Sequence, residues 1–361
     1  MDTHYKKVLW LAMVLFSVQL VTGQERVSKT VEKSFSFTNA GALQLENKYG
    51  NINLSGWDKN EVSIKISIKV NHRKKDNAKD LLKRVNPKFK SSSDNVSVVS
   101  EIANKNTGWF ADFFNSANPI DSERSHVQID YEVFLPKKTK LKVTNRFGDV
   151  IIDGWSGQLN TIIEHGDLWL GENLSKADII LKFGKLRAKD MDYASLNLKN
   201  GKLEMDNSKS LRLNSSGTEI NMNSVTSLEI YSNKDDILAT EIGTVYGNLK
   251  FSTMEISKLT KDIDLSMKIA DFRVFKILEP AAEISIEQES SEIRLAVTHF
   301  SHHFKATLEQ GLVRLPKSFE NVNSNMLDKG RKLREIEATY GHEKMGSIVI
   351  QGLKGIITLQ E

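Results

Sequence analysis

The chain has 361 residues, no cysteine and a formal net charge of +4, with 50 Lys and Arg against 46 Asp and Glu. This near balance argues against a nucleic-acid-binding surface, and the lack of cysteine excludes disulfides as a source of stability. A large buried core must therefore stabilise the fold.

Residues 1–23 predict a secretory signal peptide. Lys6 and Lys7 form a positive region, an apolar run follows over residues 8–21, and small residues precede Gln24. The apolar run is short for a transmembrane helix, so an uncleaved anchor is the less favoured alternative. We expect an exported protein of the periplasm, the cell surface or the medium, with no transmembrane segment after signal cleavage.

One motif occurs twice, over residues 43–57 and 141–155. Each copy combines alternating apolar residues with an Asn, a basic residue, an aromatic residue and a Gly, and each ends in Gly-Trp. Apolar alternation is the spacing of a strand, and the inner Gly marks a tight turn between two short strands.

Between the two copies, the sequence predicts further strands and one short helix. Residues 61–70 alternate strictly, residues 76–85 form an amphipathic helical pattern, and residues 95–102 and 126–135 are strand-like. We therefore expect residues 24–140 to form a first coil with a helix and an antiparallel strand insertion that acts as a cap.

From Leu141 to Pro316, shorter repeats of the motif recur at spacings of mostly 17 or 18 residues. The first apolar position of each repeat falls at Val150, Leu168, Leu186, Leu203, Ile220, Ile237, Met254, Phe272, Ile293 and Val313. Such a period, with two short strands per repeat, is typical of coils that stack on one another. The sequence predicts an all-β fold, a parallel β-solenoid of about ten coils over residues 141–316. A large sandwich is the alternative.

The remaining residues 317–361 predict a loop and capping strands. The segment 320–335 is polar and charged, and the strand-like stretches 346–352 and 355–359 follow it. Because the ends of a solenoid expose unpaired strand edges, we expect these strands to cover one end.

The paired motifs carry a resemblance to a known family. With Asn47-Lys48-Tyr49-Gly50, Asn145-Arg146-Phe147-Gly148 and the Gly-Trp pairs, the chain resembles the putative-adhesin-like domain of unknown function, which is frequent in exported proteins of Bacteroidota. The similarity runs from about Leu43 to the carboxyl terminus. It implies a parallel β-solenoid outside the cytoplasm, and it supplies no catalytic residues.

Candidate contact residues lie in one outward column between the apolar positions. The column holds Ile151, Trp169, Arg187, Glu204, Asn221, Leu238, Glu255, Arg273, Arg294 and Arg314. Exposed Trp169 could stack on a sugar ring or lie under a loop. Arg273, Arg294 and Arg314 could form a basic stripe for an anionic glycan. The alternative is a solvated face, in which Asp271 and Glu292 pair locally with these arginines.

An aromatic cluster stands between the two motif copies. Trp109, Phe110, Phe113 and Phe114 could contact a lipid or a partner, or could plug an open solenoid end. Both interpretations stay open from the sequence.

Signals for chemistry are weak. His299, His302 and His303 lack the ligand number and spacing of a zinc site, and no nucleophile or phosphate-loop motif occurs. If the protein were an enzyme, the first candidates to test would be the acids Asp149, Asp153 and Asp167, with Arg187 as the basic residue. We expect no catalytic residue, cofactor or metal.

The sequence thus favours an exported, non-catalytic β-solenoid that presents a binding or structural surface at the bacterial cell envelope. Its partner would be an envelope protein or a glycan. The alternative is a polysaccharide-acting enzyme, a lyase or hydrolase, on a β-helix scaffold. Partner identity and oligomeric state do not follow from the sequence.

Overall fold

The computed structural model describes residues 25–72, 74–102, 127–342 and 345–361. The residues predicted as the signal peptide, and Trp109, Phe110, Phe113 and Phe114, lie outside these ranges. Within the described part of the chain, no helix has the length and apolar character needed to cross a membrane.

Residue contacts divide the chain into two compact units. Among the described residues, the smaller unit comprises residues 25–31, 67–72, 74–86, 101–102 and 127–128. The larger unit comprises Glu32–Ile66, Pro87–Ser100 and Ile129–Glu361. The candidate sites described below lie entirely in the larger unit.

The smaller unit contains the predicted helix, α2 (Lys75–Arg84). Ala78 and Leu81 form its buried face, while basic residues occupy its last turn, where they complement the helix dipole. The helix ends shortly before Pro87, because proline disfavours a helical conformation at the residue before it.

Three more strands belong to the amino-terminal part: β1 (Glu25–Ser36), β4 (Glu61–His72) and β5 (Val85–Ser92). In β4, Val62, Ile64 and Ile66 are buried, as the strict alternation of the sequence predicts.

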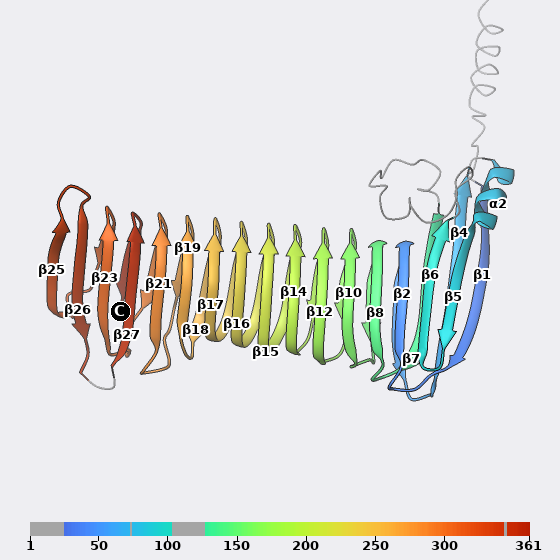
Figure 1. Cartoon of the computed structure of the whole chain (residues 1–361), viewed down its shortest axis with the longest axis horizontal. Helices are drawn as coiled ribbons and strands as arrows, with labels where there is room; N and C mark the ends of the chain where they lie inside the picture. The colour runs from blue at the N-terminus through green and yellow to red at the C-terminus, as the bar shows by residue number, and fades with distance from the viewer. Residues whose placement is uncertain (1–24, 73, 103–126, 343–344) are drawn as a thin grey trace, which may run out of the picture. The chain divides into compact units, whose positions relative to one another are not determined.

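The fold is all-β, with a large mixed sheet. Its first parallel ladder runs along the larger unit, with neighbouring strands side by side (Figure 1). In spatial order this first ladder holds β6 (Asn95–Ile102), β2 (Ala42–Tyr49), β8 (Lys140–Phe147), β10 (Gln158–Glu164), β12 (Leu174–Lys182), β14 (Met191–Lys199), β15 (Lys202–Ser216), β16 (Glu219–Asn233), β17 (Asp236–Lys250), β19 (Ile263–Lys268), β21 (Glu283–Glu289), β27 (Gly346–Leu353) and β23 (His302–Glu309).

A second parallel ladder is formed by the strands that follow each turn. It holds β7 (Val127–Pro136), β3 (Ile52–Trp57), β9 (Val150–Asp153), β11 (Leu168–Leu170), β13 (Lys185–Ala188), the first halves of β15, β16 and β17, β18 (Thr253–Leu259), β20 (Asp271–Val274), β22 (Glu292–Ala296), β28 (Ile356–Gln360) and β24 (Leu312–Arg314). Each repeat therefore contributes one strand to each ladder.

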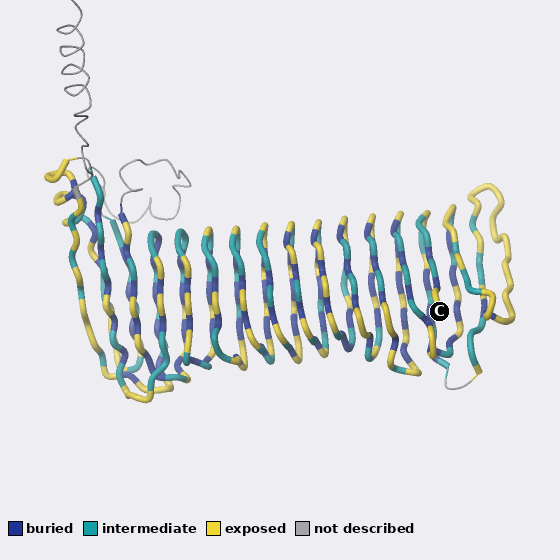
Figure 2. Tube along the Cα trace, turned by 180° about the vertical axis from the view of Figure 1, so that it is seen from behind, coloured by how far each residue is buried: buried dark blue, intermediate teal, exposed yellow. Residues whose placement is uncertain are grey.

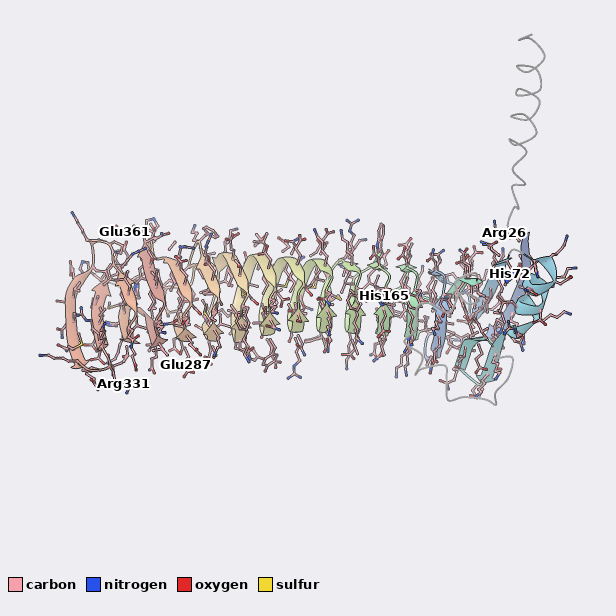
Figure 3. All side chains as sticks on the ribbon, turned by 90° about the horizontal axis from the view of Figure 1, so that it is seen from above. Arg26, His72, His165, Glu287, Arg331 and Glu361 are labelled. Atoms are coloured by element: carbon pink, nitrogen blue, oxygen red, sulfur yellow. The ribbon has the colours of Figure 1, made fainter. Side chains whose placement is uncertain are left out.

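The strand register confirms the predicted alignment of apolar residues. Leu168 lies beside Val150 on one side and Leu186 on the other, and Leu203 follows Leu186. The same column continues through Ile220, Ile237, Met254, Phe272 and Ile293. All of these side chains are buried, and buried and exposed residues alternate along the strands (Figure 2). This shared interior is the core that replaces disulfides.

The amino-terminal segment contributes strands to both ladders. β6 pairs in parallel with β2, and β7 pairs in parallel with β3. Residues 95–100 and 129–136 repeat the two-strand pattern of the motif, so they extend both ladders with the same inward alternation. The antiparallel insertion expected between the two motif copies stays a prediction.

The last two strands of the chain do not lie at the end of the ladders, where they were predicted as caps. β27 lies between β21 and β23, and β28 lies between β22 and β24, so these strands are inserted into the ladders instead of capping them. Their inward residues Ile348, Ile350, Ile357 and Leu359 are buried. Insertion gives each of the two strands a hydrogen-bonded neighbour on both sides, so neither leaves an unpaired edge.

The prediction of a loop over residues 320–335 is wrong. β25 (Glu320–Asp328) and β26 (Leu333–Tyr340) form an antiparallel pair, and β26 also pairs antiparallel with β23. All nine residues of β25 are exposed. A strand with both faces in water carries no apolar alternation, and this explains why the sequence pattern failed to indicate it.

Turn residues of the motif connect successive repeats. Gly148 has a φ of +138°, and a Cβ at this position would lie 2.2 Å from the Gly50 carbonyl oxygen. The Asp149 carboxylate accepts the backbone N–H of Asp167 at 2.9 Å, and the Asp167 carboxylate accepts that of Lys185 at 2.8 Å. These aspartates therefore stabilise turns, which is a structural role.

Candidate binding groove

An open groove of about 820 Å³ follows the outer side of the second ladder. It is lined by residues from β9 to β18 and by Phe275, which follows β20. At the strand spacing of about 4.8 Å, the groove extends on the order of 30 Å along the ladder. Its length and openness suit a chain-like ligand better than an enclosed small molecule.

Trp169 lies at one end of this groove. Its side chain is 43% exposed, and its register neighbours are Ile151 and Arg187. The Arg187 guanidinium carbon lies 5.2 Å from the centre of the indole ring, so a cation–π contact fixes the ring orientation. Trp169 thus presents an exposed aromatic ring on the outer side of the ladder.

An ion-pair cluster occupies the middle of the groove. Arg187 donates to Glu204 through Nε at 3.1 Å and Nη2 at 2.9 Å, and Lys185 Nζ lies 2.6 Å from the same carboxylate. Hydrogen bonds from Lys185 and Arg187 lower the pKa of Glu204 to about 2. Glu204 is therefore ionised at neutral pH, and its charge is used to position Arg187.

The far end of the groove is apolar again. Leu238 is 46% exposed, and Phe275 is also exposed. Between the two apolar ends, Asn221 and Asn223 of β16 provide neutral polar groups, and Thr240 adds one beside Leu238 on β17. The groove therefore combines apolar surfaces with hydrogen-bonding groups along its length.

Two acids of the groove, Asp153 and Asp206, lie too far apart to form a catalytic pair. Asp153 and Asp206 lie three strand positions apart, about 14 Å at the ladder spacing. Glycosidase carboxyl pairs lie roughly 5–9.5 Å apart. A general acid must carry a proton at the working pH, and Glu204 does not.

The three predicted arginines do not form one stripe. Arg273 pairs with Glu255 at 3.0 Å and with Asp271 at 2.9 Å. Arg294 pairs with Asp271 at 3.4 Å and with Glu292.

The third arginine is separated from the other two. The inserted β28 places Thr358 between Arg294 and Arg314. This arrangement supports the alternative interpretation of a solvated face with local ion pairs.

The histidines flagged in the sequence have different surroundings. His302 is buried, its Nδ1 lies 2.7 Å from the Phe300 carbonyl oxygen, and its ring stacks on that of Phe300. His299 and His303 are exposed. No group of three or more potential His, Cys, Asp or Glu metal ligands occurs among the described residues.

Sequence reasoning singled out Trp169 but gave no role to Glu204, Asn221 or Leu238. These residues stand in the same outward column as Trp169, so the repeat period already placed them on one face. Only the side-chain geometry shows that this face is hollowed and that Glu204 holds Arg187.

Comparison with known proteins gives distant structural matches only. No protein-family model matches the chain, and no curated protein matches it. A putative adhesin from Parabacteroides merdae ATCC 43184 is 13% identical, with a TM-score of 0.32, over 74% of this chain and 92% of that chain. A putative adhesin from Parabacteroides distasonis ATCC 8503 is 14% identical, with a TM-score of 0.27, over 92% and 97%.

A third match is a putative cell adhesion protein from Clostridium sporogenes ATCC 15579. It is 11% identical, with a TM-score of 0.20, and the match covers 93% of this chain and 100% of that chain.

Proposed function

We propose that the chain is an exported, non-catalytic, adhesin-like protein that binds a linear glycan at the bacterial cell envelope. In this proposal residues 1–23 direct export, and residues 141–316 form a parallel β-solenoid of about ten coils. The observation that carries the proposal is the groove of about 820 Å³ along one outward column.

The chemistry of the groove fits a sugar chain. Sugar rings combine apolar C–H faces with hydroxyl groups, so they require apolar contacts and hydrogen-bonding groups in alternation. Trp169 and Leu238 supply exposed apolar surface, and Asn221 and Asn223 supply amides between them. Arg187 is fixed by Glu204 and adds directed N–H donors.

Binding to polysaccharides purified from envelope fractions tests this function by isothermal titration calorimetry. We expect Trp169→Ala and Leu238→Ser each to weaken binding by about tenfold, a loss of about 1.4 kcal/mol. The matched control is Tyr193→Ala, because Tyr193 is 58% exposed on the first ladder, outside the groove. Equal affinity of all four proteins, wild type included, would contradict the proposed site.

The alternative function is a polysaccharide-acting enzyme, and the observation that favours it is that Glu204 and Asp206 line the groove from the same side of β15, two residues or roughly 7 Å apart. The test is the release of new sugar ends from the bound polysaccharide. We expect none from the wild type. Release that Asp206→Asn abolishes would establish the enzyme instead.

A further inference from the structure

A second hollow, of about 540 Å³, lies on the outer side of the first ladder. It is formed by outward residues of β2, β6, β8, β10 and β12, together with the end of β5. Four lysines line it: Lys90, Lys140, Lys142 and Lys176. Among the described residues that line it, Asp178 is the one acid.

These four lysines are exposed, and within the described residues none of their ammonium groups makes an ion pair, a hydrogen bond or a ring contact. Three arginines of the second ladder behave differently. Arg187, Arg273 and Arg294 each bond an acidic side chain. The excess positive charge at the lysine hollow is therefore uncompensated by the protein, and like charges at close range favour the binding of an anion.

The spacing of the lysines indicates a ligand with repeated charges. Lys140 and Lys142 project from the same side of β8, two residues apart, which corresponds to roughly 7 Å. Lys176 lies two strands from Lys140, with Gln158 between them, which corresponds to about 10 Å. A single small anion cannot reach all of these cations, whereas a polymer with regularly spaced charges can.

The groups between the lysines are neutral and polar. Gln44 and Asn160 flank Lys142 in the register, and Ser97 lies beside Gln44. All three line the hollow with amide and hydroxyl groups. Such groups can hydrogen-bond sugar hydroxyls. Among the described residues, no aromatic side chain lines the hollow, so this part of the chain offers no stacking surface of the kind on which proteins bind single-stranded nucleic acid.

We propose that this lysine hollow binds an acidic polysaccharide, whose carboxylate or sulfate groups pair with Lys90, Lys140, Lys142 and Lys176 while its hydroxyls bond the neutral residues between them. The site differs from the groove in ladder, residues and ligand charge. It gives the protein a second, electrostatic contact with an envelope or matrix glycan. Because exposed ion pairs are individually weak and screened by salt, binding depends on several lysines together and falls as ionic strength rises.

The experiment uses the full mature chain and three probes: polygalacturonate for carboxylates, heparin for sulfates and neutral dextran. Calorimetry at low ionic strength is expected to show saturable binding of at least one acidic probe and none of dextran. The triple variant Lys140→Gln, Lys142→Gln, Lys176→Gln is expected to weaken that binding by at least about tenfold. Raised salt is expected to weaken binding to the wild type.

The matched control is Lys199→Gln, Lys250→Gln, Lys261→Gln, which removes the same charge from exposed lysines elsewhere. It is expected to retain the affinity of the wild type, and Trp169→Ala is expected to do the same because it belongs to the groove. Equal weakening by both triple variants would overturn the proposal, since it would reveal an effect of net charge alone. Binding of an oligodeoxythymidine as tight as that of the acidic glycans would also overturn it.

Discussion

The side-chain amide of Asn145 donates a hydrogen bond to the carbonyl oxygen of Gly50 at 3.0 Å, which joins the two copies of the motif. The same amide also bonds the Gly148 carbonyl oxygen of its own turn, at 2.8 Å. Asn47, its register partner, bonds the Gly50 and Ile129 carbonyl oxygens in the same manner. The motif asparagine therefore connects each turn to the repeat beside it.

Replacing this asparagine tests its role. We expect Asn145→Ala to lower the free energy of unfolding by about 1–3 kcal/mol, because carbonyl groups that it bonds lose their donor. Chemical denaturation measures the change. Asn197→Ala is the control, since Asn197 is exposed on the first ladder. Equal effects of the two substitutions would show that the amide has no such role.

A buried aspartate replaces the glycine of the turn farther along the ladder. The Asp235 carboxylate accepts hydrogen bonds from the Ser215 and Ser232 hydroxyls, each at 2.6 Å, and from the backbone N–H of Thr218 at 2.8 Å. We expect Asp235→Ala to cost about 1.5–3 kcal/mol, since charge-assisted hydrogen bonds are lost. Thermal denaturation measures the loss of stability, and Asp236→Ala is the control because the neighbouring Asp236 is exposed. An equally large loss of stability in Asp236→Ala would contradict the role given to Asp235.

His302 makes stability depend on pH. Burial lowers the pKa of this histidine below its ordinary value of 6.5, and its Nε2 is buried without a hydrogen-bond partner. The titratable groups around it are His303, next in the chain, and Tyr340, whose hydroxyl bonds Glu361.

The sign of the pH effect follows from that lowered pKa. Below pH 6.5 the unfolded chain binds a proton that the folded chain resists, so stability is full above this pH and falls as the pH decreases. We expect His302→Phe to flatten the fall in unfolding free energy between pH 7 and pH 5, whereas His303→Phe should keep it. If the slope of unfolding free energy against pH is unchanged in His302→Phe, His302 is not the source of the pH dependence.

Much of the ladder could be predicted because its core repeats. Each apolar position from Val150 to Ile293 recurs in the sequence at the spacing of one repeat, and each contacts its counterpart in the next repeat. The short helix was predicted as well, because its buried positions Ala78 and Leu81 recur at helical spacing.

Other features depend on information that periodicity lacks. β27 and β28 come last in the chain but lie between strands that precede them in the sequence. Here the spatial order of the strands differs from their order in the chain, so the separation of Arg294 from Arg314 could not be predicted. The exposed β25 has no apolar alternation to indicate it. The groove that extends from Trp169 to Leu238 depends on how side chains pack, which the spacing of residues in the sequence does not determine.

The stacking of residues one repeat apart is the central claim, and engineered cysteine pairs test it most directly because the chain has no cysteine of its own. Asn197 pairs with Asn214 in the register, whereas Asn248 lies three strand positions from Asn197. Neighbouring strands lie about 4.8 Å apart, within the Cα separation that a disulfide spans, and three positions amount to about 14 Å. Under mild oxidation the account predicts rapid disulfide formation in Asn197→Cys, Asn214→Cys and none in Asn197→Cys, Asn248→Cys. Failure of the first pair, or equal crosslinking of both, would contradict it.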